Sequence, residues 1–267
     1  MQPGGTIDIK ITIRPTMGLN VKAGQVEVTC TEQWWDKGTP AANGDGRRQS
    51  RSVLSQPLVQ SFISDTEFTN SEPVIRYARI QVPNNAPPTV QGSVAQVAWE
   101  ITGRLEFENG SPVTKSREIT VLTPPVVQTG RSAADLTEEA SFSGCTLAMV
   151  LVNDAVGAGG YLEGELRARM NGTDQAKDIR VELHSVESAG DRQAESLQEQ
   201  VSLASDVQLT SDEPYVWAFS LPVPERMLPT VKSGHTSVSW RLKAVVDTVE
   251  TPDAYHVERE VQVFTST

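Results

Sequence analysis

Apolar and polar residues alternate with a period of two over most of this chain. Residues 6–13 are the clearest case, with isoleucine at every second position from Ile7 to Ile13. Residues 24–30 alternate in the same way. Because successive side chains of a strand point to opposite faces, this pattern predicts strands that are buried on one face.

The same pattern predicts strands along the rest of the chain, and helical periodicity is almost absent. The further predicted strands are 53–68, 74–82, 94–107, 117–122, 144–152, 161–170, 177–186, 201–209, 215–223, 235–248 and 257–264. Residues 36–51 have the Gly, Pro and Asn content of a long loop, and residues 189–200 are expected to form a loop or a short helix. The predicted fold class is therefore all-β.

A length of 267 residues suits one large β domain or two of ordinary size. Residues 124–125 are a proline pair that ends the first half. We therefore expect a first domain at 1–125, a linker at 126–141 and a second domain at 142–267. Within the linker, Ser132 is a candidate N-cap for one or two helical turns, and a plain tether is the alternative.

The two halves resemble each other at a constant offset. The shift that places Pro83 on Pro224 also places Val82 on Val223. Other pairs at this offset are Thr69 with Thr210, Pro88 with Pro229, Thr89 with Thr230, Val97 with Val238 and Trp99 with Trp240. A slip of one position then aligns 117–119 with 259–261, and the pair Gly4-Gly5 matches Gly159-Gly160 upstream. The alignment predicts an internal duplication.

The matched residues have structural roles. A proline after an alternating run stops ladder pairing, because it has no N–H to donate. A tryptophan within a strand buries a large area and fixes the packing of two sheets. The repeated motif is therefore expected to be part of the scaffold.

Residues 219–246, and more loosely 78–107, resemble the arrestin-like β-sandwich. In residues 219–246 a strand ends in Leu-Pro-Val-Pro, whereas in 78–107 it ends in Val-Pro alone. Both segments continue with a short loop that contains Pro-Thr and a strand that carries a tryptophan. The resemblance implies two tandem immunoglobulin-like sandwiches, as in arrestins and in bacterial sporulation-control proteins. It implies a prokaryotic type of arrestin-like protein with an unknown partner. The phosphate-binding lysines and the polar core of receptor arrestins match no residue here.

The two halves differ before their glycine pairs. A strand-like segment, 145–152, precedes Gly159, whereas only residues 1–3 precede Gly4. The first domain is thus expected to lack its opening strand. The chain has been trimmed, or the domain tolerates an open edge, or another chain supplies the strand by β-augmentation. An open edge requires unpaired backbone groups beside the strand at 6–13.

Composition narrows the range of partners. The chain has 23 basic and 34 acidic side chains, a formal charge of −11, which disfavours nucleic acid as a partner. Residues 1–5 have no signal-peptide character, and no apolar run is long enough to cross a membrane, so the cytoplasm is the expected location. Cys30 and Cys145 are expected to be free and buried, with one disulfide as the alternative.

The sequence indicates no catalytic residues, cofactor or metal. His184, His235 and His256 have no second ligand at metal-binding spacing, and structural roles are expected for the first two. The glycine-rich run 157–160 lacks the Lys-Ser/Thr of a phosphate loop and is expected to form a turn before a strand. We therefore expect a protein that is not an enzyme.

Two features are candidates for partner binding. Trp34 and Trp35 are adjacent in a strand, so they must point to opposite faces, and one of them must be covered by a loop or used for contact. Arg47, Arg48 and Arg51 form a local basic cluster that could attract an acidic partner or headgroup, or simply be solvated.

Three functions are compatible with these features. The favoured one is a non-enzymatic scaffold that binds other proteins through loops, sheet edges or the groove between the domains. A structural or adhesive subunit of tandem immunoglobulin-like sandwiches would gain support from a bond between Cys30 and Cys145. A hydrolase would gain support from three or more carboxylates converging in one pocket. The partner and the oligomeric state are not predicted.

Overall fold

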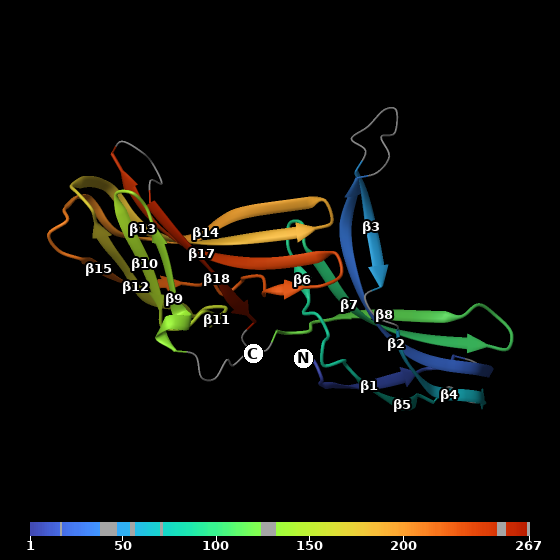
Figure 1. The fold of residues 1–267 in the computed structure, drawn as a ribbon. Coiled ribbons are helices and arrows are strands. Elements are labelled where there is room, and N and C mark those ends of the chain that lie inside the picture. The colour runs from blue at the N-terminus through green and yellow to red at the C-terminus, as the bar shows by residue number, and fades with distance from the viewer. Residues whose placement is uncertain are drawn as a thin grey trace.

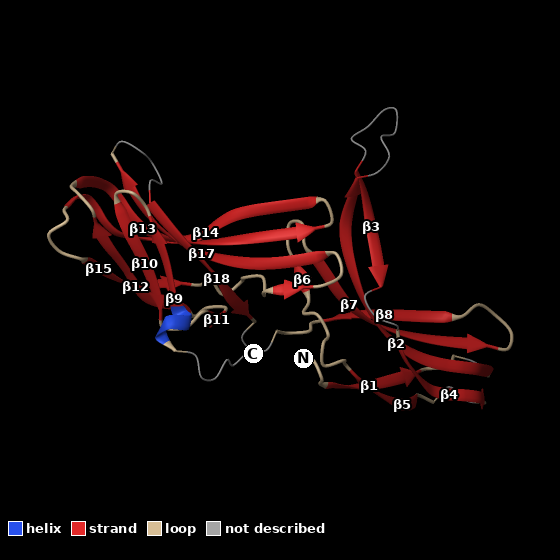
Figure 2. Ribbon diagram, in the orientation of Figure 1, coloured by secondary structure: helices blue, strands red, loops and turns tan. Residues whose placement is uncertain are grey.

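The computed structural model describes residues 1–16, 18–37, 47–53, 57–69, 72–123, 132–249 and 255–265. Nearly all of this part of the chain is strand, as predicted, and its one helix is a short 3-10 turn, η1 (Ala133–Leu136) (Figure 2). The strands form several sheets around buried apolar side chains, as in a β-sandwich.

The first eight strands lie within residues 6–119 and form two sheets (Figure 1). Their bounds are β1 (Thr6–Ile13), β2 (Leu19–Lys37), β3 (Arg47–Val53), β4 (Leu58–Phe68), β5 (Val74–Gln81), β6 (Val90–Gln91), β7 (Gln96–Phe107) and β8 (Val113–Ile119). The smaller sheet contains only β1 and β5. The larger has the order β3-β2-β7-β6, with β4 also paired to β2 and β8 to β7.

The remaining strands lie within residues 137–264 and also form two sheets. Their bounds are β9 (Thr137–Ser141), β10 (Cys145–Leu151), β11 (Ala155–Gly157), β12 (Tyr161–Met170), β13 (Asp174–Ala189), β14 (Arg192–Leu209), β15 (Tyr215–Pro222), β16 (Val231–Lys232), β17 (Thr236–Thr248) and β18 (Tyr255–Phe264). One sheet has the order β15-β12-β10-β9, and the other β11-β18-β17-β13-β14, with β16 on β17.

The repeated tryptophans do the same job in both halves. Trp99 on β7 and Trp240 on β17 are each only 1% exposed. Trp99 Nε1–H donates to the carbonyl oxygen of Pro87 at 2.9 Å, and Trp240 Nε1–H donates to that of Leu228 at 3.0 Å. Each indole is buried, as the sequence motif predicted, and its N–H also ties the core strand to the proline-bounded loop.

The matched threonines brace the same loop from its other side. Thr89 Oγ1 accepts a hydrogen bond from the Val121 amide at 2.9 Å, and its own amide donates to the Val121 carbonyl. Thr230 makes the corresponding pair of bonds with Val263. A single motif residue therefore bonds the chain that runs beside the loop in each half.

Irregular backbone features also recur at matching positions. Asp65 and Asp206, which the shift of Pro83 onto Pro224 superimposes, are the non-glycine residues with positive φ in the described part of the chain, at 39° and 53°. The β2–β4 ladder shifts register after Gly24, and the β13–β14 ladder shifts after Ile179. These two positions correspond under the shift that places Gly5 on Gly160. The two halves therefore share these loop contacts and several irregular backbone positions.

Several segments differ from the sequence-based predictions, among them residues 36–37, which lie in β2, and residues 155–157, which form β11. Residues 192–200, expected to be loop or short helix, belong to β14, because polar residues suit a strand with a solvent-facing side. Residues 47–51, expected to be loop, are in β3, which pairs with the end of β2. Residues 137–141 of the expected linker form β9, which pairs with β10. Ser132 precedes η1 as predicted, and its amide donates to Asp135 Oδ2 at 2.8 Å.

The two smaller sheets differ in size. In the second half β12 lies between β15 and β10, with β9 beyond β10. In the first half β1 pairs with β5 in an unbroken register from Thr6 to Ile13, and within the described residues no strand pairs with its other edge. This arrangement matches the open edge that the sequence comparison anticipated beside 6–13.

Replacing either tryptophan tests the shared brace. Trp99→Phe and Trp240→Phe each remove the indole N–H and leave a loop carbonyl without its donor. We expect each to lower the free energy of unfolding by about 1–3 kcal/mol, measured by chemical denaturation. Tyr77→Phe, at a residue that is 70% exposed, is the control. Equal midpoints for all three variants would contradict the assigned role.

Candidate functional site

The two halves meet at a seam that is organised by two buried carboxylates. Glu32 lies near the end of β2 and is 0% exposed, and Glu187 lies near the end of β13 and is 8% exposed. Glu32 points to the same buried face of its strand as Val28 and Cys30. Glu187 points to the same buried face as Leu183 and Ser185. Figure 1 shows β13, β14 and β17 running from the second half toward β6 and β7 of the first.

The carboxylate of Glu187 is hydrogen-bonded by the turn between β6 and β7. Its Oε2 accepts the amides of Val94 at 2.8 Å and Ala95 at 2.9 Å, and its Oε1 accepts the Ser93 hydroxyl at 3.0 Å. A Cβ on Gly92 would lie 2.1 Å from Glu187 Oε2, so only glycine permits this approach. This turn of the first half thus forms a binding site for a carboxylate of the second half.

Glu32 is received by the turn between β16 and β17 in the reciprocal way. Its Oε2 accepts the His235 amide at 3.0 Å and the Ser233 hydroxyl at 2.7 Å, and its Oε1 contacts His235 Nδ1 at 2.8 Å. Glu32 pairs with Val97 in its sheet, and Glu187 pairs with Val238, the residue that matches Val97 in the repeat. The seam is therefore a pseudo-two-fold contact in which each half supplies one carboxylate and one receiving turn.

Hydrogen bonds keep both carboxylates ionised. Burial by itself raises the pKa of Glu32, but the bonds from His235 and Ser233 outweigh it, so the pKa lies below its usual value. Burial likewise raises the pKa of Glu187, and the amides of Val94, Ala95 and Ser93 with the Ser93 hydroxyl reverse the shift. Each half therefore holds a charge that the other half stabilises.

The predicted tryptophans lie at this seam. The Trp34 ring stacks on the His235 ring at 4.0 Å between centroids, with an 8° angle between the planes. The Arg192 guanidinium lies 4.1 Å from the centroid of the Trp35 ring. Both indoles are half-buried, and both contact side chains of the second half.

Trp35 and Gly190 form a further backbone contact between the halves. They form an isolated parallel bridge, and the Asp191 amide donates to the Trp35 carbonyl at 2.8 Å. A Cβ on Gly190 would lie 2.2 Å from that carbonyl oxygen. Gly190 has a φ of +59°, which also favours glycine.

The three arginines of the basic cluster lie on β3. Arg48 is opposite Asp36 and Arg51 is opposite Gln33 in the β2–β3 ladder, and Arg47 is opposite Lys37. Their side chains lie outside the described residues. Their backbone places them on the hairpin that also carries the two tryptophans.

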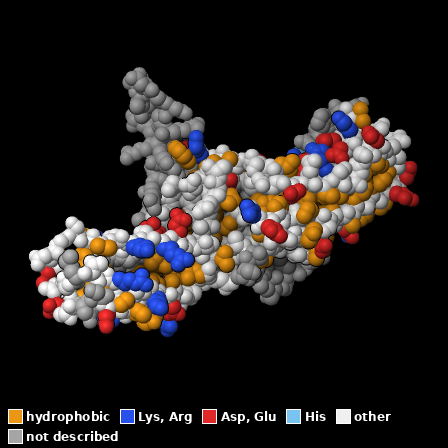
Figure 3. Space-filling model, turned by 180° about the vertical axis from the view of Figure 1, so that it is seen from behind, with side chains coloured by type: hydrophobic (Ala, Val, Ile, Leu, Met, Phe, Trp, Pro, Cys, Tyr) orange, Lys and Arg blue, Asp and Glu red, His pale blue; other side chains and the backbone are white. Residues whose placement is uncertain are grey.

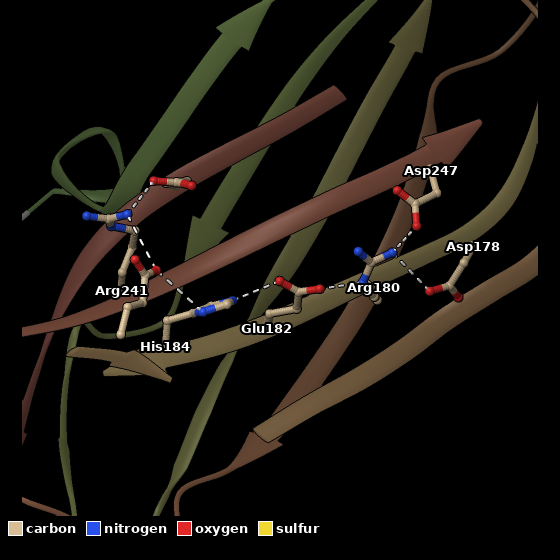
Figure 4. Close-up of polar contacts among 8 residues, drawn as sticks. Asp178, Arg180, Glu182, His184, Arg241 and Asp247 are labelled. Atoms are coloured by element: carbon tan, nitrogen blue, oxygen red, sulfur yellow. Dashed lines mark hydrogen bonds and ion pairs between the residues drawn. The ribbon is translucent and has the colours of Figure 1, made fainter. Parts of the chain in front are cut away.

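A second polar cluster follows β13 on the face away from the core (Figure 4). Arg180 bonds Glu182 at 2.5 Å, Asp178 at 3.3 Å and also Asp247 on β17. His184 Nε2 contacts the other oxygen of Glu182 at 2.8 Å. The Arg180 and Glu182 side chains are 16% and 10% exposed, so this ladder is largely shielded from water.

The ladder is suited to structural support. Burial raises the pKa of Glu182, but the bonds from His184 and Arg180 outweigh it and hold the pKa below its usual value, so Glu182 is ionised near neutrality. Three carboxylates converge on Arg180, yet they lie on a sheet face and share its charge. General-acid catalysis needs a carboxyl group with a raised pKa, which Glu182 does not supply.

A pocket of about 340 Å³ lies beside the seam on the first half. Its lining comes from β2, β6, β7 and the turn at Gly92, and includes the side chains of Gln33, Gln91 and Gln96. None of the lining residues is titratable, so the pocket offers amide hydrogen bonds and no acid or base. Among the described residues no group of three or more His, Cys, Asp or Glu is arranged to hold a metal ion.

Both cysteines are free and buried, as predicted. Burial raises the pKa of the Cys30 thiol to about 12 and that of Cys145 to about 11. At neutral pH both are therefore protonated and unreactive. The turn at 157–160 precedes β12, with Gly159 at a φ of +80°, which agrees with its predicted role as a turn.

No protein-family model matches the chain, and no curated protein matches it. No helix in the described residues is long and apolar enough to cross a membrane.

Removing the buried charges tests the seam. Glu32→Gln and Glu187→Gln each exchange an ionised acceptor for a neutral amide. We expect each to weaken the contact between the halves by about 1.5–3 kcal/mol. Loss of Trp34 stacking, followed by fluorescence against a Trp34→Phe background, and a larger radius of gyration in X-ray scattering are the measurements. Glu139→Gln, at an exposed position of β9, is the matched control.

The seam should also open in acid. Both glutamates have folded pKa values below the usual 4.5, so their stabilisation is complete above that value and is lost as the pH falls below it. We expect constant scattering near neutrality and a rising radius of gyration from about pH 4.5 downward. The double variant with both glutamines should lack this transition. An identical acid profile for the double variant would assign the transition to other groups.

The stability of the protein should depend on Arg180, the central cation of the polar cluster on β13. Arg180→Met leaves three carboxylates without their shared partner, and we expect a loss of roughly 3–5 kcal/mol in the free energy of unfolding. Arg167→Met removes an ion pair whose side chains are 54% and 43% exposed, and should cost less than ~1 kcal/mol. Chemical denaturation of both variants gives the comparison.

Proposed function

We propose that this chain is a non-enzymatic scaffold of arrestin-like type, with two domains derived by duplication, that binds other proteins. The observation that carries this proposal is the reciprocal seam. Glu32 and Glu187 fix the two halves in one orientation through charge-assisted bonds, and a fixed orientation lets two separate surfaces engage one partner together.

The duplication is supported by features that single-residue matches cannot explain. Ladder shifts, left-handed aspartates and loop-bracing bonds all recur at the spacings expected from the sequence. Pairs of sandwiches in one chain are the arrangement that the arrestin-like resemblance implies. The domain limits of 1–125 and 142–267 are part of this proposal, with β9 joining the second domain.

The two halves offer different surfaces. Residues 1–125 carry 12 basic and 12 acidic side chains, whereas residues 142–267 carry 10 and 19, so the negative charge of the chain lies mainly in the second half. Figure 3 shows lysine and arginine side chains gathered on the first half in the view from behind. We infer that partners of different charge can bind the two halves, through loops, the pocket beside the seam or the edge of β1.

The runner-up is a structural or adhesive subunit. That function would gain from a disulfide between Cys30 and Cys145, and both thiols are free and buried. Reduced thiols suit a cytoplasmic protein, which is the location we propose.

Capture from the native organism tests the scaffold. The full chain, immobilised, is compared with the Glu32→Gln/Glu187→Gln variant, and bound proteins are quantified by mass spectrometry. We expect a set of proteins that the wild type enriches at least fivefold over the variant, because the variant lets the two surfaces separate. Recovery of glycans or lipids alone, with no protein above background, would overturn the scaffold function.

A further inference from the structure

Within the described residues, the first half has a sheet edge with no strand partner at the place where the second half has two further strands. β1 and β12 correspond, since Val82 donates to the Gly5 carbonyl just as Val223 donates to that of Gly160. β12 is covered on one edge by β15 and on the other by β10. β1 has β5 in the place of β15, and within the described residues nothing pairs in the place of β10.

The direction of the backbone groups identifies which residues face this edge. The bond from Val82 to Gly5 makes them a hydrogen-bonded pair, and alternation along the antiparallel ladder then directs Ile7, Ile9 and Ile11 toward β5. The N–H and C=O groups of Asp8, Lys10 and Thr12 therefore point to the open edge. Their counterparts on β12 pair with β10, and the Val152 amide donates to the Glu163 carbonyl at 2.9 Å.

The side chains next to this edge are also incompletely covered. Ile11 on β1 is half-buried, whereas its counterpart Leu166 on β12 is 0% exposed. The strand that covers β12 buries an apolar residue at every second position: Cys145, Leu147, Met149 and Leu151, each at most 4% exposed. A two-stranded sheet is also marginal by itself, which favours addition of a further strand.

Basic side chains beside the open edge favour an acidic residue on the solvent-facing side of the added strand. Lys10, Arg14 and Arg79 are exposed on the solvent side of β1 and β5, and Asp8 is engaged by Arg79 at 2.6 Å. Val150 of β10 pairs with the residue of β12 that corresponds to Lys10, so it marks the position that would lie opposite Lys10. An acidic residue there would meet a positive charge, and opposite charges across a ladder stabilise it.

We propose that β1 is the acceptor for an extended segment of another polypeptide, which adds antiparallel to Asp8–Lys10–Thr12 with apolar residues at alternate positions facing Ile9 and Ile11 and an acidic residue facing Lys10. This acceptor edge rests on the proposed scaffold function and names the chemistry of its partner. The backbone bonds give affinity, and the alternate side chains give selectivity.

The second half supplies the probe for a test. A labelled peptide with the sequence of residues 143–153 and the change C145S is added to the full chain. We expect saturable binding by fluorescence anisotropy, and hydrogen exchange at Asp8, Lys10 and Thr12 slowed by at least ~tenfold at saturation, with β12 unchanged. The peptide with V150E should bind about two- to fivefold more tightly than the parent, and V150K more weakly.

Backbone methylation gives a control that leaves the protein untouched. N-methyl groups at peptide positions 148 and 150 block the amides that would face β1, and should lower affinity by about tenfold or more. N-methyl groups at 147 and 149 face away and should change the affinity less than about threefold.

On the protein, Lys10→Pro removes one backbone donor at the open edge and spares the bonds to β5. Lys10→Ala is its matched control.

Three outcomes would overturn the acceptor edge. The first is no binding of either peptide, and the second is equal loss from both methylation patterns. The third is concentration-dependent dimerisation of the chain with β1 already protected, which would make a second copy the occupant. Capture of proteins by the chain despite the first outcome would leave the scaffold function standing, whereas failure of capture would remove the scaffold and not the peptide result.

Discussion

The arrangement of the two halves depends on two buried carboxylates, each of which accepts hydrogen bonds from a turn of the opposite half. An ionised carboxylate inside a protein is costly unless hydrogen bonds replace its hydration. Glu32 and Glu187 accept such bonds from turns of the opposite half. Separating the halves would therefore expose or orphan two charges at once, so the seam is specific in geometry as well as stabilising.

Both repeated motifs contribute to that seam indirectly. The tryptophan and threonine of each motif hold the proline-bounded loop against the core strand. The turn that binds the glutamate follows this loop after the two-residue strand β6 or β16. A rigid turn presents its amides to a carboxylate without losing conformational entropy on contact. The structural role of the motif thus extends to the contact between the halves, because the motif residues Val97 and Val238 pair with Glu32 and Glu187 in the sheets.

Strand content and most strand positions could be predicted from alternation alone, because one buried face leaves a period of two. Residues 192–200 could not, since helix formers such as Ala194 and Glu195 suit either structure when tertiary pairing decides. The seam was also missed, although a signal was present. The alternation that buries Val28 and Cys30 also places Glu32 at a buried position, and a buried acidic side chain must have a partner elsewhere. Which turn supplies that partner depends on contacts between distant parts of the chain, which a local pattern does not contain.

The reciprocal form of the seam, in which Glu32 and Glu187 each bind a turn of the opposite half, has a consequence for assembly. A contact in which both sides carry the same donor turn and the same acceptor strand is self-complementary. The turn of one molecule is therefore chemically able to receive the glutamate of a neighbour whenever its own seam has opened. Acid treatment followed by neutralisation at high protein concentration would then trap exchanged pairs, in which each first half closes on the second half of another chain. Intramolecular closure prevails in dilute solution because the tether keeps the correct partner at high local concentration.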